Sequence, residues 1–228
     1  MAVRSASSSV ASRQAAGPEL EFSIERVEPL RFAAVPTLGF GVRIERVGGP
    51  KVRSIALNAQ IRIAATRRPY DPATQERLIE LFGGPEVWGR GLRSLPWTNA
   101  VGQVPPFDDS TVLELEVACT YDFEVAASKY LHALSDGEVP LELLFSGTVF
   151  YSGAQGALQV TLVPWEKEAT YRMPVRVWRE MMDHYFPNSA WLRLRRDSFD
   201  RLYAYRSRNA LPSWERVVDA LLDEAQEE

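Results

Sequence analysis

The chain has 228 residues with a formal net charge of −4, and 46% of the residues are hydrophobic and 25% charged. This composition is that of a globular protein and excludes an intrinsically disordered chain, while the negative charge disfavours nucleic acid and anionic membranes as partners. No apolar run approaches the ~20 residues of a membrane-spanning helix, and a single cysteine rules out an internal disulfide, so we expect a cytoplasmic protein without membrane insertion.

Residues 1–18 are expected to form a disordered tail. They are rich in Ser and Ala, include Arg4 and Arg13, and contain no acidic residue. Such a segment buries too little apolar surface to offset the entropy lost on ordering. Residues 19–228 are then expected to form a single domain.

Alternation of apolar and polar residues predicts strands between residues 19 and 66. The alternation covers residues 20–24, 38–44 and 55–63, and in the last run the odd-numbered residues are apolar. A period of two places alternate side chains on one buried face of a sheet. The intervening Val47-Gly48-Gly49-Pro50 predicts a hairpin between the second and third strands.

Residues 70–110 are expected to be an insert of helix and loop. Asp71 is a favoured N-cap, Pro72 suits the first helical position, and Gly83-Gly84 is typical of a helix end. The following stretch, 85–109, is rich in Gly and Pro and predicts a long loop.

Strands return over residues 111–165. The clearest is Thr111–Val125, whose apolar residues occupy odd positions; unbroken, it would span about 45 to 50 Å, which leaves room for a bulge or bend. A further strand covers Leu141–Tyr151, Ser152–Gly156 is a turn, and Leu158–Leu162 returns from it.

Helices are expected over residues 173–224. One begins at Met173-Pro174 and ends before Pro187, one surrounds residues 199–205, and Ser213 caps the last. This order of elements predicts an α+β fold: a long-stranded antiparallel β-sheet, open or a sandwich, with a helical insert and a C-terminal helical segment.

No motif predicts a catalytic centre, a metal site or a cofactor. His184 follows Glu180 by one helical turn, without the second histidine of a zinc protease helix. His132 lies in a short connector near Ser135, where proximity in sequence argues little for a catalytic triad. Cys119 lies on the apolar face of the longest strand, which favours an inert packing role.

Two charged clusters each have several interpretations. The acidic row of Glu114, Glu116, Asp122 and Glu124 is most simply a solvated sheet face, and otherwise a carboxylate site or an acidic docking strip. The arginine-rich segment 193–208 is most simply an internal ion-pair network, and otherwise a grip for RNA or phosphate.

Aromatic and arginine side chains are the candidates for an interaction site, because Trp and Arg are enriched at binding hot spots. Trp178 and Trp214 occupy apolar helical positions and are expected in the core. The other candidates lie in loops, at strand ends or in the basic segment: Trp88, Trp97, Trp165, Arg193, Arg195 and Arg196.

Four segments together resemble a known family: Tyr121-Asp122-Phe123-Glu124, Phe145-Ser146-Gly147-Thr148-Val149, Val163-Pro164-Trp165-Glu166 and Phe186-Pro187-Asn188. The family is an uncharacterised bacterial one, and the resemblance extends from about residue 20 to 222. Its members tend to be encoded beside nickel–iron uptake hydrogenases, and the resemblance implies no activity or functional residues. Long antiparallel strands before C-terminal helices are also similar, in architecture alone, to SecB-type export chaperones.

We therefore expect a non-enzymatic accessory or assembly protein that acts through protein–protein contacts, with a hydrogenase or maturation component as the implied partner. One alternative is a small-molecule-binding protein or enzyme with a pocket between sheet and helices. Others are a SecB-like client-binding chaperone and an RNA-binding protein. An exposed apolar patch would favour the first interpretation, and a pocket with a strongly perturbed carboxylate the second.

Overall fold

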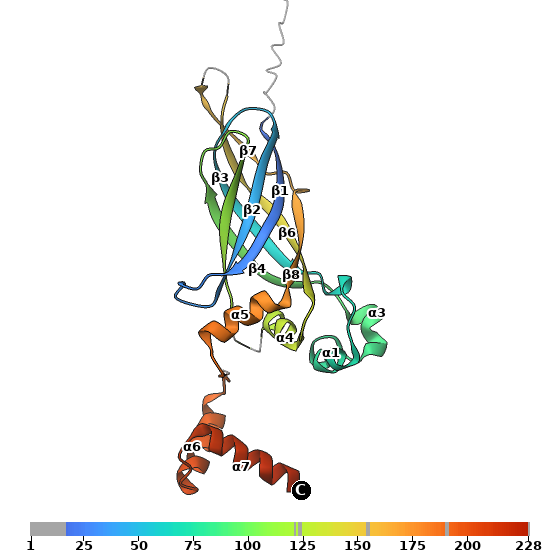
Figure 1. The fold of residues 1–228 in the computed structure, drawn as a ribbon, viewed down its shortest axis with the longest axis vertical. Coiled ribbons are helices and arrows are strands. Elements are labelled where there is room, and N and C mark those ends of the chain that lie inside the picture. The colour runs from blue at the N-terminus through green and yellow to red at the C-terminus, as the bar shows by residue number, and fades with distance from the viewer. Residues whose placement is uncertain (1–16, 121, 123–124, 154–155, 190–191, 228) are drawn as a thin grey trace, which may run out of the picture. The chain divides into compact units, whose positions relative to one another are not determined.

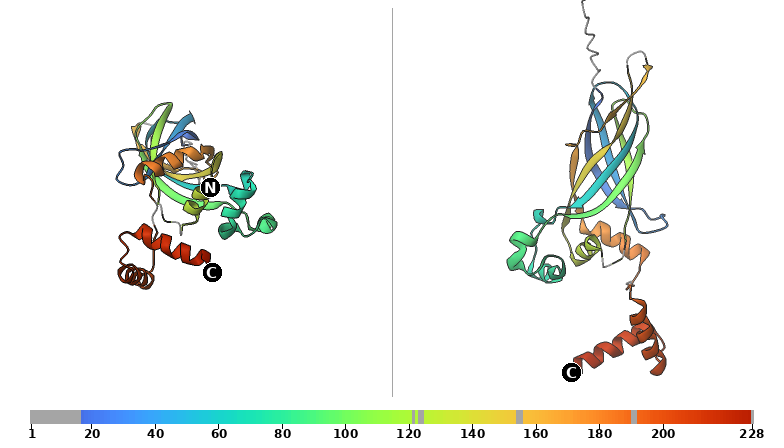
Figure 2. Two further views of the ribbon diagram at one scale, coloured as in Figure 1. Left: turned by 60° about the horizontal axis from the view of Figure 1, so that its bottom comes forward. Right: turned by 180° about the vertical axis from the view of Figure 1, so that it is seen from behind.

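The computed structural model describes residues 17–120, 122, 125–153, 156–189 and 192–227. They divide into two compact units, Met1–Ser189 and Ala190–Glu228. The first unit contains the described strands, and its helices α1, α3, α4 and α5 lie at one end of them (Figures 1 and 2). The prediction of a single domain over residues 19–228 stays a prediction.

Eight antiparallel strands form two sheets in the described part of the chain. The first sheet has the order β1–β2–β5, and the second has the order β4–β3–β6–β7, with β8 also paired to β6. The strands are β1 (Glu19–Pro29), β2 (Thr37–Gly48), β3 (Val52–Ile63), β4 (Leu95–Val104), β5 (Ser110–Ala118), β6 (Glu138–Ser152), β7 (Leu158–Leu162) and β8 (Glu168–Pro174).

The core lies between the two sheets, where the apolar face of each strand is buried. Along β3 the odd-numbered residues from Ile55 to Ile63 are buried, and along β5 Leu115 and Val117 are buried while Glu114 and Glu116 face solvent. The predicted faces of both strands are therefore confirmed. Each fully buried Leu or Ile side chain contributes about 1.5 to 3 kcal/mol of transfer free energy.

Aromatic pairs join the sheets across this core. The rings of Phe22 on β1 and Phe145 on β6 stack with centroids 4.5 Å apart. Phe40 on β2 meets Trp97 on β4 edge-on at 6.1 Å. Stacked and edge-to-face rings add about 0.5 to 1.5 kcal/mol each beyond the area that they bury.

The predicted hairpin between the second and third strands is wrong. β2 pairs with β1 and β5, whereas β3 pairs with β4 and β6, so Val47–Pro50 carries the chain from one sheet to the other. Gly49 has a φ of +78°, and a side chain there would meet the backbone of Gly17 and Pro18. The Gly-Pro sequence marks a real turn, but a turn signal does not say whether the strands that it joins become neighbours.

The long strand predicted for Thr111–Val125 is shorter than expected. β5 ends at Ala118, which pairs with Thr37, the first residue of β2. The Cys119 N–H group still donates to the Pro36 oxygen at 2.7 Å, and the next element among the described residues is the helix α4 (Ala126–Ala133). His132 therefore lies on a helix and not in a connector, and Asp122 is not on the strand that carries Glu114. Residues 121, 123 and 124 lie outside the described residues.

Two further strands contradict the sequence prediction. β4 occupies part of the expected loop 85–109, and β8 precedes the helix expected to begin at Met173-Pro174. Pro96 interrupts the alternation of β4, so the sequence pattern does not indicate a strand there. The β3–β4 register shifts between Ile61 and Arg62, beside Pro96, and such an irregularity tolerates a residue without an N–H group.

Helices cover one end of the sheets. The cap predicted at Asp71 is confirmed, because its side chain accepts a hydrogen bond from the Thr74 N–H group at 2.9 Å, and the helical segment ends at Gly83 as expected. In the first unit the helices are η1 (Ala65–Arg67), α1 (Pro72–Arg77), α2 (Ile79–Phe82), η2 (Pro85–Val87), α3 (Trp88–Gly91), α4 and α5 (Val175–Tyr185).

The helix α5 closes the core at this end. Its apolar side, which includes Val177, Trp178 and Met181, is buried, and the helix packs against β1, β2 and β8. Trp178 is therefore a core residue, as expected.

The second unit is a pair of helices, α6 (Arg196–Arg208) and α7 (Trp214–Glu227). Ser213 caps α7 as predicted, since its hydroxyl accepts a hydrogen bond from the Arg216 N–H group at 3.3 Å. The α+β class with antiparallel sheets is thus confirmed. No helix in the described part of the chain is both long and apolar enough to cross a membrane.

Candidate interaction surface

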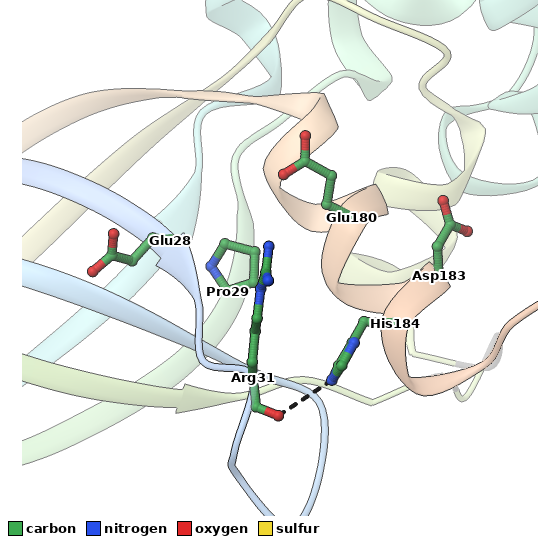
Figure 3. A pocket seen from close by; sticks show the side chains of 6 residues that line it. All are labelled: Glu28, Pro29, Arg31, Glu180, Asp183 and His184. Carbon is green, nitrogen blue, oxygen red and sulfur yellow. Dashed lines mark hydrogen bonds between the residues drawn. The ribbon is translucent and has the colours of Figure 1, made fainter.

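The pocket in Figure 3 lies between the end of β1 and the helix α5 and has a volume of about 630 Å³. Polar side chains line most of it: Glu28, Pro29, Arg31, Glu180, Asp183 and His184. Two of its carboxylates have basic partners nearby. Glu28 accepts a hydrogen bond from Arg26 Nε at 3.1 Å, and Arg176 Nη1 lies 3.7 Å from Glu180 Oε1.

His184 and its neighbour hold the loop between β1 and β2. The His184 Nε2 atom is 3.2 Å from the backbone oxygen of Arg31, which Figure 3 marks, and does not contact Glu180. The Tyr185 hydroxyl lies 2.9 and 2.8 Å from the carbonyl oxygens of Leu30 and Ala33. His184 therefore attaches this loop to α5, whereas Glu180 lies near Arg176. Among the described residues no three His, Cys, Asp or Glu side chains are placed to hold a metal ion.

Several ionisable groups in or beside the core have shifted pKa values. Burial raises the pKa of the Cys119 thiol to about 12. Burial, followed by the neighbouring Tyr130 hydroxyl, raises the pKa of Tyr70, and burial also raises the pKa of Tyr130. The two hydroxyl oxygens are 2.7 Å apart, and Tyr70 also donates to the Ala65 carbonyl at 2.7 Å. Burial, then Arg179 and Arg77, lowers the pKa of His132.

The acidic row is divided by the structure. Glu114 is exposed and lies 3.2 Å from Arg26 Nη2, and Glu116 is exposed on the same strand. Asp122 lies beyond the end of β5, and Glu124 is outside the described residues. Glu114 and Glu116 thus form the solvated face of a sheet edge, which was the favoured interpretation of the row.

Two of the three candidate tryptophans pack against the core. Trp88 donates its Nε1 hydrogen to the Gly83 carbonyl at 2.8 Å, and its ring lies edge-on to Tyr70 and Phe82. Trp97 is half-buried against Phe40. These contacts fix the insert and the edge strand β4 to the sheets.

Trp165 is different, because its side chain is 89% exposed in the turn between β7 and β8. The candidate arginines lie in the second unit, where Arg195 Nη2 is 3.2 Å from Asp197 Oδ2 and Arg196 Nε is 3.8 Å from Asp200 Oδ2. Arg193 precedes them in the same segment. The structure thus groups the three arginines with one another and leaves the three tryptophans on separate elements.

The sequence prediction missed an apolar surface on β7. Leu158, Val160 and Leu162 are 66%, 56% and 70% exposed, and in the register with β6 they lie opposite Ser152, Phe150 and Thr148 on the outer face of the sheet. Trp165 follows three residues after Leu162. We call these four residues, Leu158, Val160, Leu162 and Trp165, the β7 surface.

The register between β6 and β7 explains why the apolar residues of β7 face outward. The buried residues of β6 are odd-numbered at this end, and Val149 pairs with Thr161 and Tyr151 with Gln159. The inward positions of β7 are therefore polar, and its apolar residues are left on the other face. The number of residues between β6 and β7 decides which residues of β7 face inward. This count was the signal in the sequence that could have revealed the exposed apolar face.

The backbone groups of β7 that make no hydrogen bond to β6 belong to the same apolar residues. Gly153 N–H donates to the Ala157 oxygen at 2.7 Å and Val163 N–H to the Gly147 oxygen at 3.0 Å. Since hydrogen-bonded pairs alternate along an antiparallel ladder, the backbone groups of Leu158, Val160 and Leu162 point away from β6. Among the described residues, β7 pairs with β6 alone. β7 contains no proline and no charged residue along the edge that faces away from β6. Such residues commonly block the addition of another strand.

Comparisons with known proteins identify a family and little else. The model of a family of unknown function, DUF6084, matches residues 17–228. No curated protein matches the sequence.

Weak similarity connects part of the chain to solved β-glucosidases. The enzyme from Kluyveromyces marxianus is 12% identical with a TM-score of 0.24, over 68% of this chain and 15% of the enzyme. β-Glucosidase 3B from Thermotoga neapolitana is 11% identical with a TM-score of 0.25, over 68% of this chain and 17% of the enzyme. At these scores the similarity carries no argument about fold or function.

Proposed function

The chain belongs to DUF6084, a family of unknown function, and we propose that it is a non-enzymatic accessory protein that binds another protein through the β7 surface. The observation that carries this proposal is the outward apolar face of β7, with three exposed aliphatic side chains on one short strand. Contiguous exposed apolar side chains are a common mark of protein interaction sites.

The geometry favours a partner that contributes an extended strand. The backbone groups of Leu158, Val160 and Leu162 point away from β6, so an added strand can pair with them. The side chains of the same residues give such a strand an apolar surface, and Trp165 supplies an aromatic anchor at its end. Side chains of an added strand would lie beside these residues as cross-strand pairs, each of which contributes about 0.2 to 1 kcal/mol.

The resemblance to proteins encoded beside nickel–iron uptake hydrogenases supplies the candidate partner. We propose a structural or maturation component of such a hydrogenase, on the resemblance alone. A small-molecule-binding or RNA-binding role stays a prediction, and no feature of the β7 surface favours either over a protein partner. A SecB-like client-binding role also stays a prediction.

The test is co-purification from the native host with mass spectrometry of the captured proteins. Tagged wild-type protein should retain a hydrogenase or maturation component, and Val160→Lys should reduce the recovery about tenfold or more because it places a charge in the centre of the apolar face. Val101→Lys is the matched control, since Val101 is 77% exposed on β4 at the opposite edge of the same sheet.

Thermal unfolding of both variants checks that the first unit stays folded. Recovery of the same component by all three proteins would show that β7 is not the binding surface. Absence of any hydrogenase or maturation component from the wild-type sample would overturn the proposed partner.

A further inference from the structure

The second unit has too small a core to account for its own stability. Its helices touch through Trp214, whose ring centroid lies 5.4 Å from that of Phe199 and 4.9 Å from the Arg206 guanidinium carbon. The Tyr205 hydroxyl donates to Glu224 Oε1 at 2.8 Å. Among the residues of this unit whose burial is described, Val217 alone is buried. A unit of this size with one buried side chain needs a further surface to pack against.

Each helix of the pair carries an exposed apolar stripe. On α7, Val218 and Leu222 follow Trp214 at intervals of four residues and are 50% and 56% exposed. On α6, Phe199 and Tyr203 are 43% and 56% exposed and have the same spacing. Residues four apart lie on one face of a helix, so each pair forms a continuous stripe.

The charges of the two helices are opposite. α6 (Arg196–Arg208) contains four arginines and two aspartates, whereas α7 (Trp214–Glu227) contains five carboxylates and one arginine. The chain thus carries a basic helix with an aromatic stripe and an acidic helix with an aliphatic stripe. Within one copy Phe199 and Tyr203 of α6 both contact the Trp214 ring of α7, and this contact leaves part of each stripe exposed.

We propose that the second unit binds a second copy of this chain, with the acidic helix α7 of each copy packed on the basic helix α6 of the other. A two-fold arrangement needs a self-complementary surface. The opposite charges of α6 and α7 provide one, because the contact between α7 of one copy and α6 of the other occurs twice in the dimer. The exposed stripes form the apolar centre of this interface and the charged residues its rim. This surface is separate from β7, and the inference does not depend on the proposed function.

Charge reversal tests the reciprocal packing directly. One full-length variant carries Arg196→Glu and Arg201→Glu on α6, and a second carries Asp219→Arg and Asp223→Arg on α7; all four side chains are exposed. Each variant alone should be monomeric by native mass spectrometry, because like charges then face each other. An equimolar mixture should restore a dimer containing one copy of each, since both contacts regain opposite charges.

A substitution in the apolar stripe of α7 tests the centre of the proposed interface. Leu222→Glu should weaken dimerisation of the full chain about tenfold or more in analytical ultracentrifugation. Leu192→Glu is the matched control, because Leu192 is 77% exposed but precedes both helices, and it should leave dimerisation unchanged. Val160→Lys should also leave it unchanged.

A wild-type chain that stays monomeric at about 100 μM would overturn the inference. So would a mixture of the two charge-reversed variants that forms no mixed dimer, a result expected if the stripes are covered by the same chain or by a different protein.

Discussion

Cys119 illustrates how completely burial decides the chemistry of a side chain. It lies just beyond β5 with its sulfur 3.5 Å from the Val117 carbonyl oxygen, and it is buried as the sequence pattern predicted. Burial raises the pKa of the thiol to about 12. Because the thiolate is the reactive form, a thiol with this pKa is almost entirely unreactive near neutral pH.

We expect Cys119 in the folded protein to react with iodoacetamide at pH 8 about a thousandfold more slowly than in the denatured chain. The factor follows from the thiolate fraction, which falls about tenfold for each unit by which the pKa exceeds the pH. Mass spectrometry gives the labelling rate, and Cys119→Ala shows that no other residue is labelled. Rapid labelling of the native protein would contradict the packing role.

Gly147 shows what a single backbone position requires of its residue. It lies in the middle of β6 with a φ of +146°, opposite Leu57 on β3. A Cβ atom built on it would be 2.1 Å from the Ala56 carbonyl oxygen, far inside contact distance. The close approach of β3 and β6 at the centre of the larger sheet therefore depends on the absence of a side chain.

At the scale of the β3–β6 pair, Gly147→Ala should lower the free energy of unfolding by about 2 to 4 kcal/mol, through backbone strain and a clash with β3. Gly89→Ala is the control: Gly89 has an ordinary φ, and a Cβ there would meet no atom within 4 Å. Urea denaturation of both variants measures the difference. Equal stability of the two would show that β3 shifts to accept the methyl group.

Single strands were more predictable than the way in which they pair. The buried faces of β3 and β5 follow from strict alternation, because a strand with one solvated face must alternate. The partners of β2 do not follow, since its pairing with β5 depends on the path of the intervening chain. β7 alternates as β3 does, yet its apolar residues face solvent whereas those of β3 face the core. Only the register of β7 with β6 decides this difference.

The candidate site was predictable in part for the same reason. Trp165 was placed at the surface because it follows a strand end, and it is exposed. The aliphatic residues beside it were missed, since apolar residues in an alternating strand are ordinarily assigned to the core. Trp88 and Trp97 reach back to the core from segments that looked like loops, and this packing depends on tertiary contacts that no local pattern encodes.

At the scale of the whole molecule, the main hydrophobic core is confined to the first unit. The buried residues of that core extend from Leu20 to Met182, and the partly buried residues packed on them end at Phe186. The second unit contributes no residue to this core among those described. The two units therefore have separate sources of stability.

We expect a chain that ends at Ser189 to unfold cooperatively with a melting temperature within about 2 °C of that of the full chain, because its core is complete. Differential scanning calorimetry measures this. The same truncated protein should be monomeric, since it lacks α6 and α7. Loss of cooperative unfolding would show that the first unit needs the last 39 residues, Ala190–Glu228, to fold.

The strand order of the smaller sheet has a consequence for synthesis on the ribosome. β2 is the central strand, but its partner β5 is made only after β3, the insert and β4. At about 5 to 20 residues per second, roughly 3 to 12 s separate the synthesis of Gly48 from that of Ser110. Throughout this interval the edge of β2 that later pairs with β5 presents unpaired backbone N–H and C=O groups. We therefore expect the nascent chain to be most prone to incorrect strand pairing before β5 emerges.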